Sequence, residues 1–84
     1  MYNRLLKSPT EVDFVLYGPR GLKAFEIKRG QYFRSNLTGL KAFRKDYPMA
    51  ECYLLYGGEH MRQENGIRIM PLVQALKKLP DILG

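Results

Sequence analysis

Cysteines, acidic residues and long apolar runs are all scarce in this sequence. The one cysteine, Cys52, cannot form an internal disulfide, which excludes a disulfide-stapled secreted scaffold and suits a reducing compartment and a thiol that only packs. No apolar run approaches the roughly 20 residues that a membrane span needs. The first residues also lack the apolar core of a signal peptide. We therefore expect a cytoplasmic protein with no membrane partner.

Several catalytic patterns are missing as well. The sequence has no phosphate-binding glycine loop that ends in Gly-Lys-Ser/Thr, so it carries no ATPase motif of that kind. Ser8, Ser35 and Cys52 have no convincing base, which argues against serine or cysteine nucleophile catalysis. The one histidine, His60, lies in a polar stretch and makes a weak metal-ligand set.

The size and charge of the chain set its class. Its 84 residues allow one small domain, residues 1–84, with a limited core. It carries 14 lysines and arginines against 8 aspartates and glutamates, a net charge of +6. This basic excess favours polyanionic partners such as nucleic acid.

Hydrophobic patterning predicts five strands and two helices. The expected strands cover residues 2–6, 11–17, 22–28, 50–56 and 67–70, and the expected helices run from an N-cap at Ser35 or Asn36 to just before Pro48 and from Pro71 to Leu79, with Pro80 as the stop. We expect a mixed α/β fold, with a central mixed sheet in the order strand, strand, strand, helix, strand, strand, helix and a parallel pair across the first helix. Two helices cannot cover both faces. This predicts a truncated domain, or one that borrows surface from a second copy or a larger parent chain, and a homo-oligomer formed through an apolar patch.

Acidic residues lie in two apolar runs that flank the turn Gly18-Pro19-Arg20-Gly21. If the loop has two or four residues, Tyr17 pairs with Leu22 and Asp13 faces Glu26, with Cβ atoms about 5 Å apart. A three-residue loop would instead set Asp13 opposite Phe25.

The same register sets Glu11 opposite Lys28, so three carboxylates and one ammonium share one patch. Carboxylates of this kind supply part of the oxygen shell of Mg²⁺ or Mn²⁺, and a bound ion relieves their mutual repulsion. Lys28 is placed to orient an attacking water and to stabilise charge on a phosphate. The plainer alternative is a pair of solvated acids on a hairpin, with Lys28 paired to Glu11.

Asp13, twelve intervening residues and then Glu26-Ile27-Lys28 resemble the core of the PD-(D/E)xK nuclease-like superfamily. The resemblance implies a restriction-endonuclease-like core, here without its leading helix. It also implies a catalytic and metal-binding role for Asp13 and Glu26, a catalytic lysine at Lys28 and an extra acid at Glu11. EVDFVL, AFEIKRG and IMPLVQALKKLPDIL resemble more closely still the domain of unknown function at the C-terminus of many bacterial AAA-type ATPases, which implies a parent or partner ATPase module.

Basic residues outside this patch are candidate contacts to nucleic-acid phosphates, with DNA favoured over RNA. They are Arg29, Arg34, Lys41, Arg44 and Lys45. Such charges also form ordinary solvated helix faces. The function expected from the sequence is a metal-dependent nuclease-like domain that acts on phosphodiesters. The alternative is a non-catalytic module that kept the fold and binds nucleic acid or protein.

Overall fold

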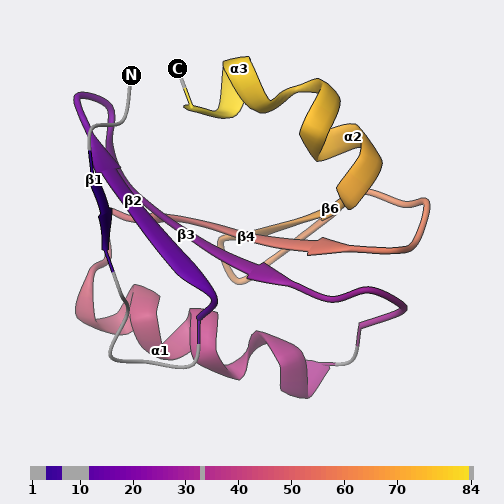
Figure 1. The fold of residues 1–84 in the computed structure, drawn as a ribbon. Helices are drawn as coiled ribbons and strands as arrows, with labels where there is room; N and C mark the ends of the chain where they lie inside the picture. The colour runs from indigo at the N-terminus through magenta and orange to yellow at the C-terminus, as the bar shows by residue number, and fades with distance from the viewer. Residues whose placement is uncertain (1–3, 7–11, 33, 84) are drawn as a thin grey trace.

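The structure, a computed structural model, describes residues 4–6, 12–32 and 34–83. In this part of the chain a twisted sheet lies between two helical layers, with α1 on one face and α2 and α3 on the other (Figure 1). The elements are β1 Arg4–Leu6, β2 Phe14–Gly18, β3 Gly21–Ile27, the 3₁₀ helix η1 Arg34–Leu37, α1 Thr38–Asp46, β4 Glu51–Tyr56, β5 Arg62–Glu64, β6 Ile67–Pro71, α2 Leu72–Lys77 and α3 Leu79–Leu83.

The sheet is mixed, as the sequence predicts. Its strand order is β1-β2-β3-β4-β6-β5. The pairs β3–β4 and β4–β6 are parallel, and the other pairs are antiparallel. The parallel pair across α1 is therefore confirmed. β4, read in the sequence as buried on both faces, is buried from Cys52 onward.

The β2–β3 hairpin has the predicted register from Phe14 to Gly18, whereas Asp13, which that register would set opposite Glu26, lies at a bend before β2 and is outside the paired residues. Tyr17 pairs with Leu22 and Phe14 with Phe25, so the loop is the two residues Pro19 and Arg20, and the three-residue alternative is wrong. Gly21 closes the hairpin with a φ of 106°, a conformation that residues with a side chain rarely adopt.

The expected start of the first helix is wrong. Neither Ser35 nor Asn36 caps it, because both lie inside η1, and α1 begins at Thr38 after Leu37 without a side-chain cap. Its end before Pro48 is confirmed, since α1 stops at Asp46.

The second half of the chain corrects the sequence prediction in two places. The polar stretch before residue 67 contains the edge strand β5, which hydrophobic patterning missed. Helical structure also continues past Pro80, because this proline occupies the second position of α3, where its missing N–H is not needed. Pro71 ends β6 and caps α2 with a ψ of 135°. α3 adds to the cover that α2 gives to the second face of the sheet.

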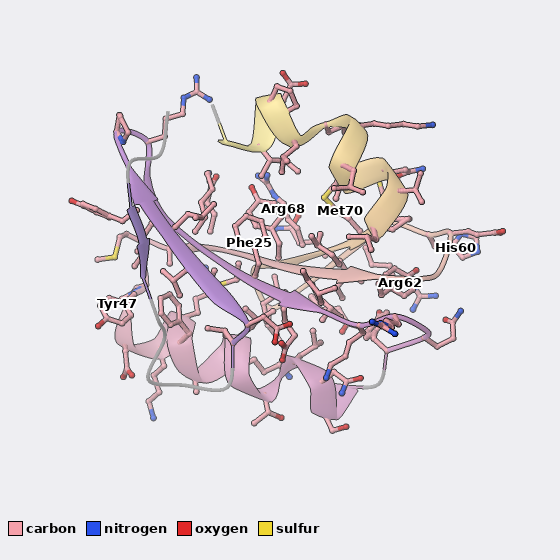
Figure 2. The ribbon with its side chains drawn as sticks, viewed as in Figure 1. Phe25, Tyr47, His60, Arg62, Arg68 and Met70 are labelled. Carbon is pink, nitrogen blue, oxygen red and sulfur yellow. The ribbon has the colours of Figure 1, made fainter. Side chains whose placement is uncertain are left out.

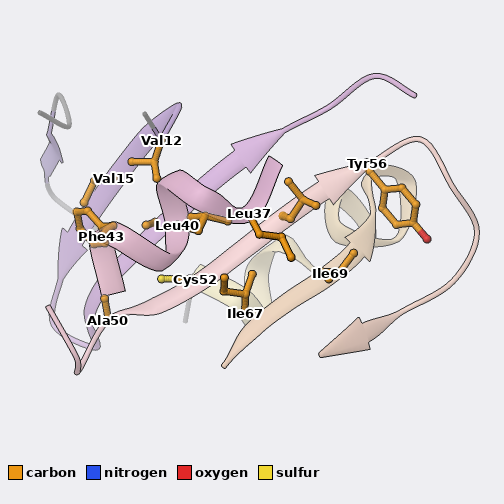
Figure 3. Close-up of a cluster of buried hydrophobic side chains, with 12 residues drawn as sticks. Val12, Val15, Leu37, Leu40, Phe43, Ala50, Cys52, Tyr56, Ile67 and Ile69 are labelled. Carbon is orange, nitrogen blue, oxygen red and sulfur yellow. The ribbon is translucent and has the colours of Figure 1, made fainter. Parts of the chain in front are cut away.

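Two apolar cores lie on opposite faces of the sheet. The larger core lies against α1 and includes Leu40, Phe43 and the thiol of Cys52 (Figure 3). Burial raises the pKa of the Cys52 thiol, and nearby Arg44 opposes the shift. The smaller core lies under α2 and α3 and includes Phe25. In the described part of the chain, the helices are too short or too polar to cross a membrane.

Candidate functional site

Asp13 lies at a bend where β2 begins. Val12 and Val15 both pack in the core under α1, so the strict alternation of strand side chains breaks between them and Asp13 is exposed. The backbone N–H of Asp13 donates to the Phe25 carbonyl at 3.0 Å. Its carboxylate Oδ2 accepts the N–H of Ile27 at 2.6 Å. Asp13 is therefore hydrogen-bonded to β3 through its backbone at Phe25 and through its side chain at Ile27, on either side of Glu26.

Glu26 lies on the α1 side of the sheet, and Lys28 follows the last residue of β3. Ala24 belongs to the core under α1, and the period of two along β3 puts Glu26 on the same face. The Lys28 N–H donates to the Leu55 carbonyl at 2.8 Å, which continues the parallel ladder past the end of β3. Glu26 is only 7% exposed and Lys28 is half-buried. The carboxylate of Glu26 thus lies deeper than that of Asp13.

The structure places Asp13 next to the segment Glu26-Ile27-Lys28. We call Asp13, Glu26 and Lys28 together the acid corner. Glu11 lies outside the described residues. Two carboxylates with water are a common magnesium set, so the donor chemistry fits a hard cation. Within residues 4–6, 12–32 and 34–83, however, no three His, Cys, Asp or Glu side chains are grouped to hold a metal ion. One Asp13 oxygen is also engaged by the backbone of β3.

The loops next to the acid corner pack tightly together. The N–H of Gly57 donates to the Gly30 carbonyl at 2.9 Å, which joins the loop after β3 to the loop after β4. A Cβ atom at Gly57 would collide with the Arg29 carbonyl oxygen. The segment that carries Lys28 and Arg29 is therefore fixed against the sheet.

Three of the five predicted phosphate contacts gather on one surface. Lys41, Arg44 and Lys45 are exposed on α1 and line a shallow hollow of about 260 Å³ with Asn65. The Arg44 guanidinium Nη1 donates to the Asn65 carbonyl at 3.4 Å.

The other two predicted contacts lie elsewhere. Arg29 is exposed in the loop after β3, and Arg34 begins η1 with a side chain outside the described set. A separate group of cations on the far face, around Lys23 and Arg68, was not predicted. Each sits on a strand as an isolated basic residue, so nothing in the local pattern marks the pair.

The family relationship of the chain comes from its match to a family model. Residues 2–75 match the model described as Domain of unknown function (DUF4143). The chain belongs to this family. DUF4143 is known as a C-terminal domain of AAA-type ATPases, as the sequence resemblance implied. No curated protein and no solved structure matches the chain.

Proposed function

We propose that the acid corner binds a divalent cation, Mg²⁺ or Mn²⁺, and acts on phosphodiester bonds of nucleic acid, with DNA favoured over RNA. In this proposal the mixed sheet with its α1 crossover is a restriction-endonuclease-like core of the PD-(D/E)xK type. The natural setting is an ATPase that carries this domain at its C-terminus.

One observation carries the proposal. The hydrogen bond from the Ile27 N–H to the Asp13 carboxylate holds the first acid against the residue between Glu26 and Lys28. Residues that are far apart in the sequence are thereby joined in one corner, as metal-dependent phosphodiester cleavage requires.

Asp13, Glu26 and Lys28 have different roles in the proposed reaction. Asp13 and Glu26 hold the cation, which supplies positive charge next to the phosphate and a more acidic water. Lys28 orients the attacking water and stabilises the charge that develops on the phosphate oxygens. Lys41, Arg44 and Lys45 lie on α1, which covers the same face of the sheet, and contact phosphates farther along the strand without reading sequence.

Metal binding is tested with variants that keep the backbone bond. In Asp13→Asn the side-chain oxygen still accepts from Ile27, so only the negative charge is lost. We expect Mn²⁺ titrations followed by calorimetry to show binding to the wild type and at least about tenfold weaker binding to Asp13→Asn and Glu26→Gln. Asp46→Asn, which changes an exposed acid at the end of α1, is the matched control. Equal binding by all four proteins would disprove the metal site.

Catalysis is tested on plasmid and single-stranded substrates with manganese. We expect Asp13→Asn and Lys28→Met each to lower the cleavage rate by about 100-fold or more. Lys77→Met, a cation on the opposite helical layer, should cleave like the wild type. Equal nicking by every variant would identify a contaminating nuclease.

A second candidate is a non-catalytic module that recruits nucleic acid or protein for the ATPase. The observation that favours it is a structural role of Asp13. Its carboxylate accepts the Ile27 N–H, a hydrogen bond that a backbone carbonyl of the neighbouring strand would otherwise accept. An unaltered fold, no metal binding, and DNA binding that weakens with Lys41→Gln and Lys45→Gln would support this module over the nuclease.

A further inference from the structure

A second hollow lies on the opposite face of the sheet, between the strands and the two C-terminal helices. Its volume is about 590 Å³, within the range of small-molecule sites. Figure 2 shows Arg68 and Met70 on this side, between the sheet and α2–α3. The charged residues that line it are five cations, Arg20, Lys23, Arg62, Arg68 and Lys78, and two acids, Glu51 and Asp81. We call it the cationic hollow, because three positive charges remain after the two acids are matched.

Lys23 forms the deep end of the cationic hollow. It is 4% exposed, on β3, and its ammonium pairs with the Glu51 carboxylate on the neighbouring strand. The ammonium also lies 6.0 Å from the centre of the Tyr53 ring. The narrow end of a ligand contacts a buried ammonium of this kind more easily than the middle of a long chain does.

Arg68 lies beside the same tyrosine. Its guanidinium carbon is 5.7 Å from the Tyr53 ring centre, and its Nη1 donates to the Tyr53 hydroxyl at 3.3 Å. Phe25 stacks on Tyr53 at 5.1 Å between ring centres, which fixes the tyrosine in turn. Arginine has five donors in a planar fork, and the tyrosine contact engages one nitrogen. The fork is therefore oriented in advance for a tetrahedral anion.

The electrostatics of the hollow favour an added anion. Burial lowers the pKa of the Lys23 ammonium, and the positive charges of Arg68 and Arg20 lower it further. An anion between Lys23 and Arg68 would relieve this repulsion.

We propose that the cationic hollow binds the terminal phosphate of a small phosphorylated molecule, with Lys23 and Arg68 as its main contacts. A phosphomonoester carries close to two negative charges at neutral pH. It therefore neutralises more of the three excess positive charges than a ligand with a single carboxylate would. A phosphomonoester is linked to its organic part through one oxygen only, so its three terminal oxygens can face the buried ammonium. Met61, Met70 and Ile82 line the same hollow and offer apolar contact to the organic part.

A nucleic-acid strand fits the hollow less well. Each internal phosphodiester is flanked by two sugars and carries a single charge, so it cannot reach Lys23 end-on. The exposed cations of α1, on the other face, suit a strand better. The proposal is therefore independent of the acid corner and of its metal.

The experiment uses matched ligands. Calorimetric titration of the whole chain at pH 7.5 compares two monoesters, 5′-AMP and glucose 6-phosphate, with the diester 3′,5′-cyclic AMP and a thymidine oligonucleotide without terminal phosphates. We expect at least one monoester to bind more tightly than cyclic AMP and the oligonucleotide. Amide NMR shifts should change at Lys23, Tyr53 and Arg68. No binding of either monoester, or tighter binding of the oligonucleotide with shifts at these residues, overturns the proposal.

Matched variants locate the site. Arg68 and Arg20 are exposed on the surface, so Arg68→Gln and Arg20→Gln are expected to fold. Arg68→Gln should weaken monoester binding by about tenfold, the effect of one lost charge-assisted hydrogen bond, and Arg20→Gln by less. Lys77→Gln removes an exposed cation of α2 that does not line the hollow and should bind like the wild type. Equal weakening in Arg68→Gln and Lys77→Gln would show that binding follows net charge and not this hollow.

Discussion

The two faces of the sheet are covered by helices of different lengths. α1 has nine residues and lays Leu40 and Phe43 across a continuous apolar core. The opposite face is covered by α2 and α3, with six and five residues, over a smaller core. The short helices leave room beside them, and charged side chains from β3, β4 and β6 occupy that room.

The broad apolar contact under α1 stabilises the fold. The incompletely covered face instead exposes polar groups that are held by a rigid sheet. The acid corner lies on the well-covered face, where Glu26 is buried beside apolar side chains. The cationic hollow lies on the thinly covered face. In the two proposals, the two faces carry different chemistry on one sheet.

The largest expected effect concerns the core under α1. Leu40→Ala should lower the free energy of unfolding by about 2–5 kcal/mol, because Leu40 is fully buried and its removal leaves a cavity. Leu76→Ala changes a leucine of α2 that is 59% exposed and should cost less than about 0.5 kcal/mol. Urea denaturation of both variants measures the contrast. Equal losses would mean that the thinly covered face stabilises the fold as much as the α1 face does.

The next effect concerns the bend at Asp13. Asp13→Ala should lower the free energy of unfolding by about 1.5 kcal/mol, since the Ile27 N–H loses a charged acceptor at an exposed site. Asp13→Asn keeps an acceptor oxygen and should lose less than half as much. Denaturation curves of the two variants and the wild type measure both losses. A full-size loss in Asp13→Asn would show that charge, and not the hydrogen bond, stabilises the corner.

Local patterns predicted much of the first half of the fold. Gly18-Pro19-Arg20-Gly21 has turn chemistry strong enough to fix the hairpin register, and that register predicted the pairing of Tyr17 with Leu22. The run that became β4 was read correctly because a strand buried on both faces is apolar throughout.

The missed elements depend on less obvious signals. β5 is polar and only three residues long, so hydrophobic patterning cannot detect it. Its signal is Asn65-Gly66, where φ values of 51° and 79° form the two-residue hairpin turn typical of this dipeptide. α3 was missed because Pro80 was interpreted as a stop.

The candidate sites divide in the same way. The sequence predicts that the hairpin brings Asp13 near Glu26 and Lys28, but not the bend at Asp13 or the hydrogen bond from the Ile27 N–H to its carboxylate. Lys23 and Arg68 meet only because β4 lies between β3 and β6 and carries Tyr53. That arrangement depends on the topology of the whole sheet, which no local motif encodes. Self-association likewise stays a prediction.

The Asn65-Gly66 turn allows a test that links the basic surface of α1 to the edge of the sheet. Gly66→Ala should lower the free energy of unfolding by about 1 kcal/mol, because a φ of 79° is strained for alanine. The added Cβ also meets the Arg44 guanidinium and should displace it from Asn65. Gly30→Ala, with open space around its Cβ and no positive φ, is the control and should change stability little. A stable Gly66→Ala protein would contradict the turn geometry.

The smallest expected effect is the pH dependence that Lys23 gives to the thinly covered face. Because the pKa of Lys23 in the folded chain lies below its ordinary value of 10.5, the unfolded chain holds more protons on this group at alkaline pH. Its contribution to stability therefore rises with pH through the window between the folded pKa and 10.5. Subtracting the curve of Lys23→Met from that of the wild type isolates this contribution, since the other titrations cancel. Arg68→Gln removes one cause of the lowered pKa and should flatten the rise, whereas Arg29→Gln, an exposed arginine outside the hollow, should leave it intact. A difference curve that falls with pH would mean that the ion pair with Glu51 outweighs burial, and that the cationic hollow is already balanced without an added anion.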